Sequence, residues 1–234
     1  MGQKILQLET ERLARGGFRD IFQHPEKEDL LIKVVRAASR TGAATERPWS
    51  GSMRRYGVYT PYLREMKEYL AACVRCAGCP PHIQQCHGLV DTDRGLGMVV
   101  EKLHGPDGEL APNLARTLRA RGIDGRIWKL YEAFEASVRK HELVINDLHP
   151  SNIVLASDDG GERLVLVDGL GEKAFFPFRT LSRGFNRYKI DRDVKYLEVR
   201  MKRIAAELHW PGRFNRRTAG QLRLEELIDR PPPA

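Results

Sequence analysis

The sequence predicts an α+β protein with two lobes, a strand-rich first half followed by a helix-rich second half. Short apolar runs bounded by turn residues dominate the first part of the chain, whereas apolar residues recur at helical spacing over long stretches of the second part. A Gly-Pro-Asp-Gly-Glu stretch at 105–109 separates the two patterns. We therefore expect one lobe at 1–103, with a small antiparallel sheet and one main helix, and a mostly helical lobe at 104–234.

Composition indicates a globular chain with excess positive charge. Hydrophobic residues make up 41% of the 234 residues and charged residues 30%, which excludes disordered and multi-span membrane classes. The net charge of +8 favours an anionic partner, which could be a nucleotide, a nucleic acid or membrane phosphate. No apolar run approaches the roughly 18 residues that span a bilayer, and the N-terminus lacks a secretory signal. These features predict a cytoplasmic protein without a transmembrane segment.

Apolar runs bounded by turn residues predict four strands in the first lobe. They are expected at 13–22, 30–35, 82–90 and 97–103. The first run is interrupted by Gly16 and Gly17, and the second by Lys33. A lysine within a strand that is otherwise apolar needs a partner for its charge.

One main helix is expected between these strand pairs. Thr60 is predicted to cap it, Pro61 lies in its first turn, and Gly78 ends it. Apolar residues recur along it at helical spacing and predict its buried stripe. They are Leu63, Met66, Leu70, Cys73 and Ala77. The preceding residues, 36–60, are rich in small residues and arginine, which indicates a mobile basic loop.

The second lobe is predicted to contain three helices and a small inserted sheet element. The helices are expected at 111–120, 125–141 and 191–208, with Asp124 capping the second. Short strand-like runs are expected at 144–146, 152–156 and 164–167. The last helix presents an inward apolar stripe, formed by Val194, Leu197, Met201, Ile204 and Leu208.

The residues that suggest chemistry lie in the stretches VINDLHPSNIVL and LVLVDGLGE. Asp147 precedes Asn152 by five positions, and Asp168 ends an apolar strand. Phosphoryl transfer from a nucleotide needs a carboxylate at the acceptor hydroxyl, an amide and a second carboxylate on magnesium, and a lysine on the phosphates. Lys33 supplies the lysine, and Glu65 on the following helix can hold its ammonium group.

These loops are similar to the catalytic and metal loops of protein-kinase-like folds. More closely, the order RGGFRDIFQHP, LIKVV, REMKEYL, HGLV, PSNI and DGLGE resembles the PhoP regulatory network YrbL family of bacterial kinase-like proteins, over about residues 8–190. The resemblance implies a bilobal protein-kinase-like fold. It also implies that Lys33 contacts phosphates, that Glu65 pairs with Lys33, that Asp147 is the catalytic aspartate, and that Asn152 and Asp168 bind magnesium.

The chain departs from the kinase pattern at three places. Ala14, Gly16 and Gly17 stand where a longer glycine motif is usual, although their backbone amides could still cover a phosphate. Asn146 replaces the arginine that commonly precedes the catalytic aspartate, and no Ala-Pro-Glu segment follows Asp168. These departures argue against the architecture of a regulated protein kinase.

The resemblance implies a phosphotransferase that uses ATP and Mg²⁺ and transfers the γ-phosphate to an unidentified hydroxyl. A small molecule, a lipid-linked sugar or a protein could be the acceptor, and nucleic acid is not required as a partner. The alternative within the same fold is a nucleotide-binding pseudokinase, or regulatory module, without turnover.

Four cysteines fall within one short stretch at the end of the predicted helix. Cys73, Cys76, Cys79 and Cys86 form the pattern C-x2-C-x2-C-x6-C, and thiolates at such spacings bind zinc or an iron–sulfur cluster. The cysteines are also compatible with packed or redox-active thiols. A metal- or redox-sensing protein is therefore a third functional hypothesis.

Two further features have alternative interpretations. His149 is expected to form hydrogen bonds within its turn rather than to act as a base. Aromatic residues at 175–185 interleave with basic residues, a composition that suits either packing of the second lobe or a nucleic-acid or membrane surface. The aromatic residues are Phe175, Phe176, Phe178 and Phe185.

Overall fold

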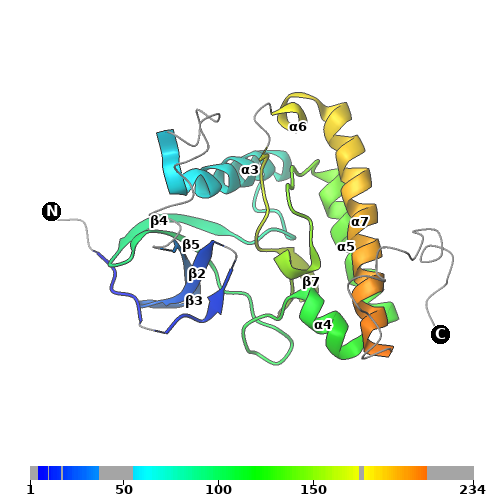
Figure 1. The fold of residues 1–234 in the computed structure, drawn as a ribbon, viewed down its shortest axis with the longest axis horizontal. Helices are drawn as coiled ribbons and strands as arrows, with labels where there is room; N and C mark the ends of the chain where they lie inside the picture. The colour runs from blue at the N-terminus through cyan, green and yellow to red at the C-terminus, as the bar shows by residue number, and fades with distance from the viewer. Residues whose placement is uncertain (1–4, 10, 17, 37–54, 174–176, 210–234) are drawn as a thin grey trace, which may run out of the picture. The chain divides into compact units, whose positions relative to one another are not determined.

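The computed structural model describes residues 5–9, 11–16, 18–36, 55–173 and 177–209 (Figure 1). The chain divides into two compact units, Met1–Leu103 and His104–Ala234. Most of the predicted basic loop, at 37–54, lies outside the described residues. Within the described part of the chain, no helix combines the length and the apolar character that crossing a bilayer requires.

The first unit is built on a five-stranded antiparallel sheet in the order β1-β2-β3-β5-β4. The strands are β1 (Ala14–Arg15), β2 (Arg19–His24), β3 (Lys27–Val35), β4 (Cys86–Thr92) and β5 (Gly95–Glu101). The prediction of an antiparallel sheet in the first half of the chain is confirmed, although the first predicted strand is two strands joined by a turn that contains Gly16.

The central strand β3 separates two apolar clusters because successive side chains of a strand point to opposite faces. Leu30, Ile32 and Val34 pack with Phe22 on one face. Leu31 and Val35 pack on the other face with Tyr62, which comes from helix α3 (Thr60–Cys76). Lys33 has the parity of Leu31 and Val35, so the register places it on the face that α3 covers.

The N-terminus of α3 differs from the sequence prediction. Thr60 is the first helical residue rather than the cap, and its hydroxyl donates to the carbonyl of Gly57 at 2.8 Å. The cap position is Tyr59, at the end of the 3-10 helix η1 (Gly57–Tyr59), and its side chain makes no capping bond. The helix ends as expected before Gly78: its last residue is Cys76, and its C-cap, Ala77, adopts the left-handed conformation.

The predicted buried stripe of α3 was wrong. Leu70 is 60% exposed, and the buried positions include Tyr62, Glu65, Glu68 and Ala72. The inward face accepts two carboxylates because each has a cationic partner, which offsets the cost of removing its charge from water. Apolar periodicity could not identify this face, since ion-paired glutamates occupy part of it.

The second unit contains four α-helices and a two-stranded sheet among its described residues. The elements are α4 (Leu114–Arg121), α5 (Gly125–Lys140), η2 (Pro150–Asn152), β6 (Ile153–Asp158), β7 (Gly161–Leu166), α6 (Phe178–Leu181) and α7 (Arg183–His209). Helices α4 and α5 both contact α7, the long orange helix of Figure 1. Asp124 caps α5 as predicted, by accepting from the amide of Ile127 at 2.7 Å.

Helix α7 begins at Arg183, eight residues before the predicted start. Its predicted inward stripe is confirmed at Val194, Leu197, Met201 and Ile204, which are all buried, and the side chain of Leu208 lies outside the described residues. The predicted strand at 144–146 does not form. Instead, Ile145 makes one isolated antiparallel bridge with Leu170.

Candidate functional site

In the first unit, the structure brings Lys33 and Glu65 together as the sequence suggested. Lys33 Nζ lies 3.5 Å from Glu65 Oε1, and the two side chains are 4% and 11% exposed. The strand β3 presents the lysine on the face that α3 covers, and α3 presents the glutamate on its inward side. The pair is therefore buried, and each charge needs the other.

Gln84 is a second partner of Lys33 that the sequence analysis missed. Its side-chain oxygen accepts from Lys33 Nζ at 2.6 Å, and its amide nitrogen donates to the carbonyl of Glu101 at 2.8 Å. The amide is thus oriented by the backbone at the end of β5. Gln84 lies two positions before β4, and no periodic pattern in the sequence could have identified it.

Arg19 is a third buried charge at this site and was also missed. Arg19 Nη1 donates to Glu65 Oε2 at 2.6 Å, and its guanidinium lies 5.9 Å from the ring centroid of Tyr62. Glu65 therefore holds two cations, with Arg19 at the shorter distance. In the sequence, the only indication of Arg19 was its position within the strand predicted at 13–22.

Gly16, in the first turn, does not present the free amide that was expected of it. The N–H of Gly16 donates to the carbonyl of Arg19 at 2.8 Å, and the carbonyl of Gly16 accepts from Arg36 Nη2 at 2.6 Å. Gly16 thus uses its N–H to close the β1–β2 turn. Gly17 lies outside the described residues.

In the second unit, Asp147 and Asn152 form one hydrogen-bonded loop. The Asn152 amide nitrogen donates to Asp147 Oδ2 at 3.0 Å and to the Asp147 carbonyl at 3.1 Å. The loop is anchored by Leu148 and Pro150, which are both buried, while Asp147 is exposed. Asp147 is thus held by Asn152 and remains exposed to solvent.

Gly169 joins this loop to the segment that carries Asp168. The carbonyl of Gly169 accepts from the amides of Asn146, at 2.7 Å, and Asp147, at 3.4 Å. Gly169 has φ +93°, and a Cβ at this position would lie only 2.7 Å from the Asp147 carbonyl oxygen. Its amide donates to Asp168 Oδ1 at 2.7 Å. The close approach of the two loops therefore requires glycine.

The donor atoms of these loops fit a hard cation such as magnesium. Asn152 and Asp168 offer oxygen ligands, because the bonds from the Asn152 amide nitrogen to Asp147 leave the Asn152 amide oxygen as the ligand atom. No cluster of three His, Cys, Asp or Glu side chains suited to a metal occurs in the described parts of the chain. Magnesium is nevertheless compatible with this set, because it usually keeps several waters and takes one or two carboxylates together with substrate phosphates.

His149 caps η2, as its expected role in the turn implies. Its Nδ1 accepts from the amide of Ser151 at 3.2 Å and lies 2.7 Å from the Ser151 hydroxyl. Burial, followed by the positive charge of Arg200, lowers the pKa of His149. The neutral imidazole with an unprotonated Nδ1 is the form that can accept the amide.

The cysteines do not converge on a shared metal site. All four are free thiols, and no three of them form a cluster suited to a metal among the described residues. Cys86 packs against the cluster that contains Tyr62, whereas Cys79 is exposed and lies 3.1 Å from the Tyr69 hydroxyl. Burial raises the pKa of the Cys73 thiol and of the Cys86 thiol. The packed-thiol interpretation therefore has the greater support.

The aromatic and basic segment is only partly described, since Phe175 and Phe176 lie outside the described residues. Phe178 and Phe185 are exposed and stack edge to face with ring centroids 6.2 Å apart. A nucleic-acid or membrane surface here stays a prediction.

Comparison with known families gives one extended match. The family model described as PhoP regulatory network protein YrbL matches residues 5–202. Two curated relatives, both named "Uncharacterized protein YrbL", come from Escherichia coli (strain K12) and Shigella flexneri. Each is 26% identical to this chain over 180 residues, covering 75% of this chain and 77% of the relative.

Solved structures give the fold. Rad53 1–466 in complex with AMP-PNP has a TM-score of 0.53 and 14% identity, covering 88% of this chain and 52% of that chain. The Mycobacterium tuberculosis PknI kinase domain has a TM-score of 0.46 and 18% identity, covering 84% of this chain and 69% of that chain. The likeness to Rad53 confirms the protein-kinase-like fold that the sequence predicted.

Proposed function

The chain belongs to the PhoP regulatory network protein YrbL family, and on that premise we propose that it is an ATP-dependent phosphotransferase that transfers the γ-phosphate to a hydroxyl acceptor. The observation that carries the proposal is the hydrogen-bonded loop of Asp147 and Asn152, joined to Asp168 through Gly169. The acceptor belongs to one of three classes: a small molecule, a lipid-linked sugar or a protein.

Each residue has one role in this proposal. Asp147 orients the acceptor hydroxyl and takes its proton, and it can do so because it is exposed at the end of an anchored loop. Asn152 and Asp168 hold magnesium through oxygen atoms, and magnesium, when bound, neutralises charge on the nucleotide phosphates. Lys33 contacts those phosphates, and Glu65 positions Lys33. The AMP-PNP complex of Rad53 makes an adenine nucleotide the first ligand to test.

One observation favours the alternative, a nucleotide-binding module without turnover. Glu65 lies 2.6 Å from Arg19 but 3.5 Å from Lys33, and Lys33 is hydrogen-bonded to Gln84 instead. A lysine shared in this way is less available to phosphates than one held by glutamate alone. Under this alternative, the protein would still bind the nucleotide but would not transfer its γ-phosphate.

Transfer of radiolabel from [γ-³²P]ATP with magnesium into fractionated bacterial extract tests the proposal. Asp147→Asn keeps the shape of the side chain and removes the base, so we expect labelling to fall about 10²–10⁴-fold while MgATP still raises the melting temperature. Asp159→Asn, at an exposed turn position, is the matched control and should label like wild type. MgATP binding with no Asp147-dependent label in any fraction would leave the module without turnover as the function.

A further inference from the structure

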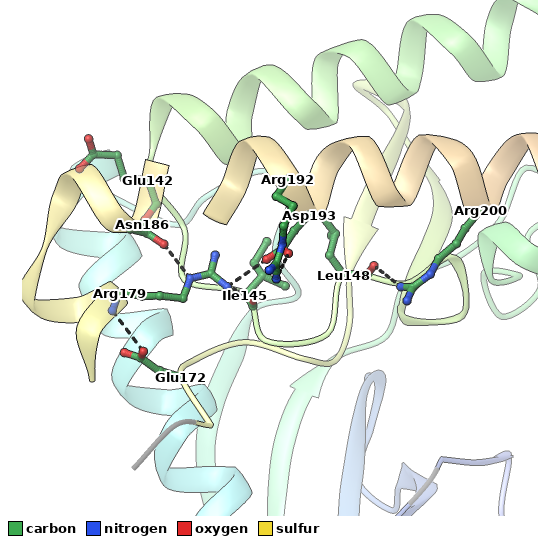
Figure 2. A network of polar contacts seen from close by, with 9 residues as sticks. All are labelled: Glu142, Ile145, Leu148, Glu172, Arg179, Asn186, Arg192, Asp193 and Arg200. Carbon is green, nitrogen blue, oxygen red and sulfur yellow. Dashed lines mark hydrogen bonds and ion pairs between the residues drawn. The ribbon is translucent and has the colours of Figure 1, made fainter. Parts of the chain in front are cut away.

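Arg179 is a buried arginine that no role in the proposed function uses. It lies in α6, is 8% exposed, and sits at the centre of the polar network in Figure 2. Its guanidinium donates to the carbonyl of Ile145 at 2.5 Å and to Asn186 Oδ1 at 2.9 Å. The same guanidinium lies 3.1 Å from Asp193 Oδ2.

These contacts join the catalytic loop to α7. Ile145 stands two positions before Asp147 and forms the isolated bridge with Leu170 that aligns the catalytic and metal loops. Asn186 and Asp193 both belong to α7, which presents them toward Arg179 (Figure 2). One guanidinium therefore links the carbonyl of Ile145 to a long helix whose apolar stripe is buried.

Glu172, which follows Asp168, contacts the chain at Arg179 and Thr180. The Arg179 amide donates to Glu172 Oε1 at 3.1 Å, and the other carboxylate oxygen accepts from the Thr180 amide and hydroxyl, each at 3.3 Å. Glu172 lies four positions after Asp168. The side chain of Arg179 thus fixes the chain before Asp147, while its backbone is tied to the chain after Asp168.

The chemistry of the site requires an arginine. A planar guanidinium can donate in several fixed directions at once, and here it serves a carbonyl, an amide oxygen and a carboxylate. Asp193 supplies the opposite charge, and the side chains of Arg179 and Asp193 are 7% and 17% exposed. A lysine carries the same charge, but its compact ammonium group cannot donate to these three acceptors in the directions that the planar guanidinium provides.

We propose that Arg179 is a positioning residue that holds the catalytic and metal loops in register, with anions supplied by the chain itself. The inference rests on the proposed function because the loops are those assigned to phosphoryl transfer. Protein kinases commonly order the segment after the metal loop by pairing arginine with a phosphorylated side chain. In this chain the Asp193 carboxylate is the anionic partner of the Arg179 guanidinium, and Glu172 accepts from the backbone amides of Arg179 and Thr180, so ordering of these loops needs no phosphorylation.

The test uses the full chain and reads out hydrogen exchange as well as turnover. In Arg179→Met, we expect the amides of Asn146 and Asp147 to exchange about tenfold faster or more, which is the equilibrium effect of losing one charge-assisted hydrogen bond. We expect kcat for ATP consumption to fall by a similar factor while KM for ATP changes less than about twofold. In Arg179→Lys, we expect both the exchange rates and kcat to lie between those of wild type and Arg179→Met. Arg187→Met is the matched control, since Arg187 is 68% exposed and pairs with Glu142 at the surface.

A second variant separates positioning from stability. Arg179→Met combined with Asp193→Leu replaces the buried ion pair by apolar side chains, which can restore the melting temperature. We expect exchange in the catalytic loop to stay fast in this double variant. If recovery of the melting temperature also restores slow exchange, Arg179 is only structural and the proposal is overturned. Wild-type exchange that slows after phosphorylation would overturn the claim of independence from phosphate.

Hydrogen exchange also distinguishes this inference from the proposed function. If wild-type protein transfers no phosphate, slow exchange that depends on Arg179 still supports the positioning role, and the function alone fails. If wild type is active and Arg179→Met changes neither exchange nor kcat, the positioning role alone fails.

Discussion

At the scale of single residues, Glu65 holds two buried cations, Arg19 at 2.6 Å and Lys33 at 3.5 Å. The three side chains are each 11% exposed or less, so solvent screens their charges weakly. Removing the carboxylate would leave two buried cations without their shared anion. We therefore expect loss of the Glu65 charge to lower the free energy of unfolding more than loss of either cation would.

We expect Glu65→Gln to lower the free energy of unfolding by about 3–5 kcal/mol, the usual cost of breaking a buried ion pair from one side. Urea unfolding measures this change. Glu68→Gln is the matched control, because Glu68 lies on the same buried face and pairs with Arg75, whose side chain is 31% exposed. The loss there should be smaller. Equal losses in the two variants would contradict the shared-anion description.

We expect His149 to make the stability of the second unit depend on pH. Its pKa is lowered by burial, then by Arg200, and Arg119 adds in the same direction while Asp147 opposes. The unfolded imidazole titrates near 6.5. As the pH falls below this value, the unfolded chain takes up a proton that the folded chain resists, so stability is lost between about pH 6.5 and the lower folded pKa.

We expect His149→Asn to flatten this dependence, because asparagine can accept the Ser151 amide without titrating. Melting temperatures of both proteins between pH 7.5 and 5.5 provide the measurement. A slope should remain in the variant, since the pKa values of His24 and His141 are also lowered. Identical slopes would show that His149 does not contribute.

At the scale of elements, the loops that carry Asp147 and Asp168 depend on one glycine. Gly169 combines φ +93° with a 2.7 Å approach of any added Cβ to the Asp147 carbonyl. Gly161, the first residue of β7, has φ +98° but open space around the position of an added Cβ. Alanine variants at the two positions therefore separate the cost of backbone strain from the cost of crowding.

We expect both Gly161→Ala and Gly169→Ala to lose about 1–3 kcal/mol from backbone strain. Gly169→Ala should lose a further 1–3 kcal/mol or so from crowding, and with it most of the ATP consumption. Thermal or urea unfolding, together with the activity assay, measures both effects. Equal stability of the two variants would mean that the loops can separate at no cost.

Local sequence patterns predicted most of the helices and strands and the buried face of α7, but not the buried face of α3. The strands of the first unit, the Asp124 cap and the inward stripe of α7 followed from short-range periodicity and capping chemistry. The buried face of α3 did not, because ion-paired glutamates replace the apolar residues that periodicity detects.

At the scale of the whole molecule, the net charge of +8 suits an anionic partner without selecting one. The cation proposed to contact nucleotide phosphates is buried, whereas many other basic residues, such as Arg183 at 82% exposure, face solvent. Exposed charges are screened by salt far more than buried ones. Salt therefore distinguishes a specific nucleotide site from general attraction to polyanions.

We expect binding of a labelled single-stranded oligonucleotide to weaken steeply, by orders of magnitude, between 50 and 200 mM salt. The increase in melting temperature caused by MgATP should change little over the same range. Fluorescence anisotropy and thermal unfolding provide the two measurements. Tight oligonucleotide binding that resists salt would establish nucleic acid as a partner after all.

The sequence alone determined the identity and order of the motif residues, because Lys33, Glu65, Asp147, Asn152 and Asp168 lie in short stretches that match the pattern of kinase-like loops. Only the tertiary structure decided which other residues join them. Arg19 reaches Glu65 across 46 positions, Gln84 reaches Lys33 across 51, and Arg179 reaches Ile145 across 34. Such contacts form only when distant segments pack together and buried charges are paired. They cannot be predicted from local periodicity, because it describes residues only a few positions apart.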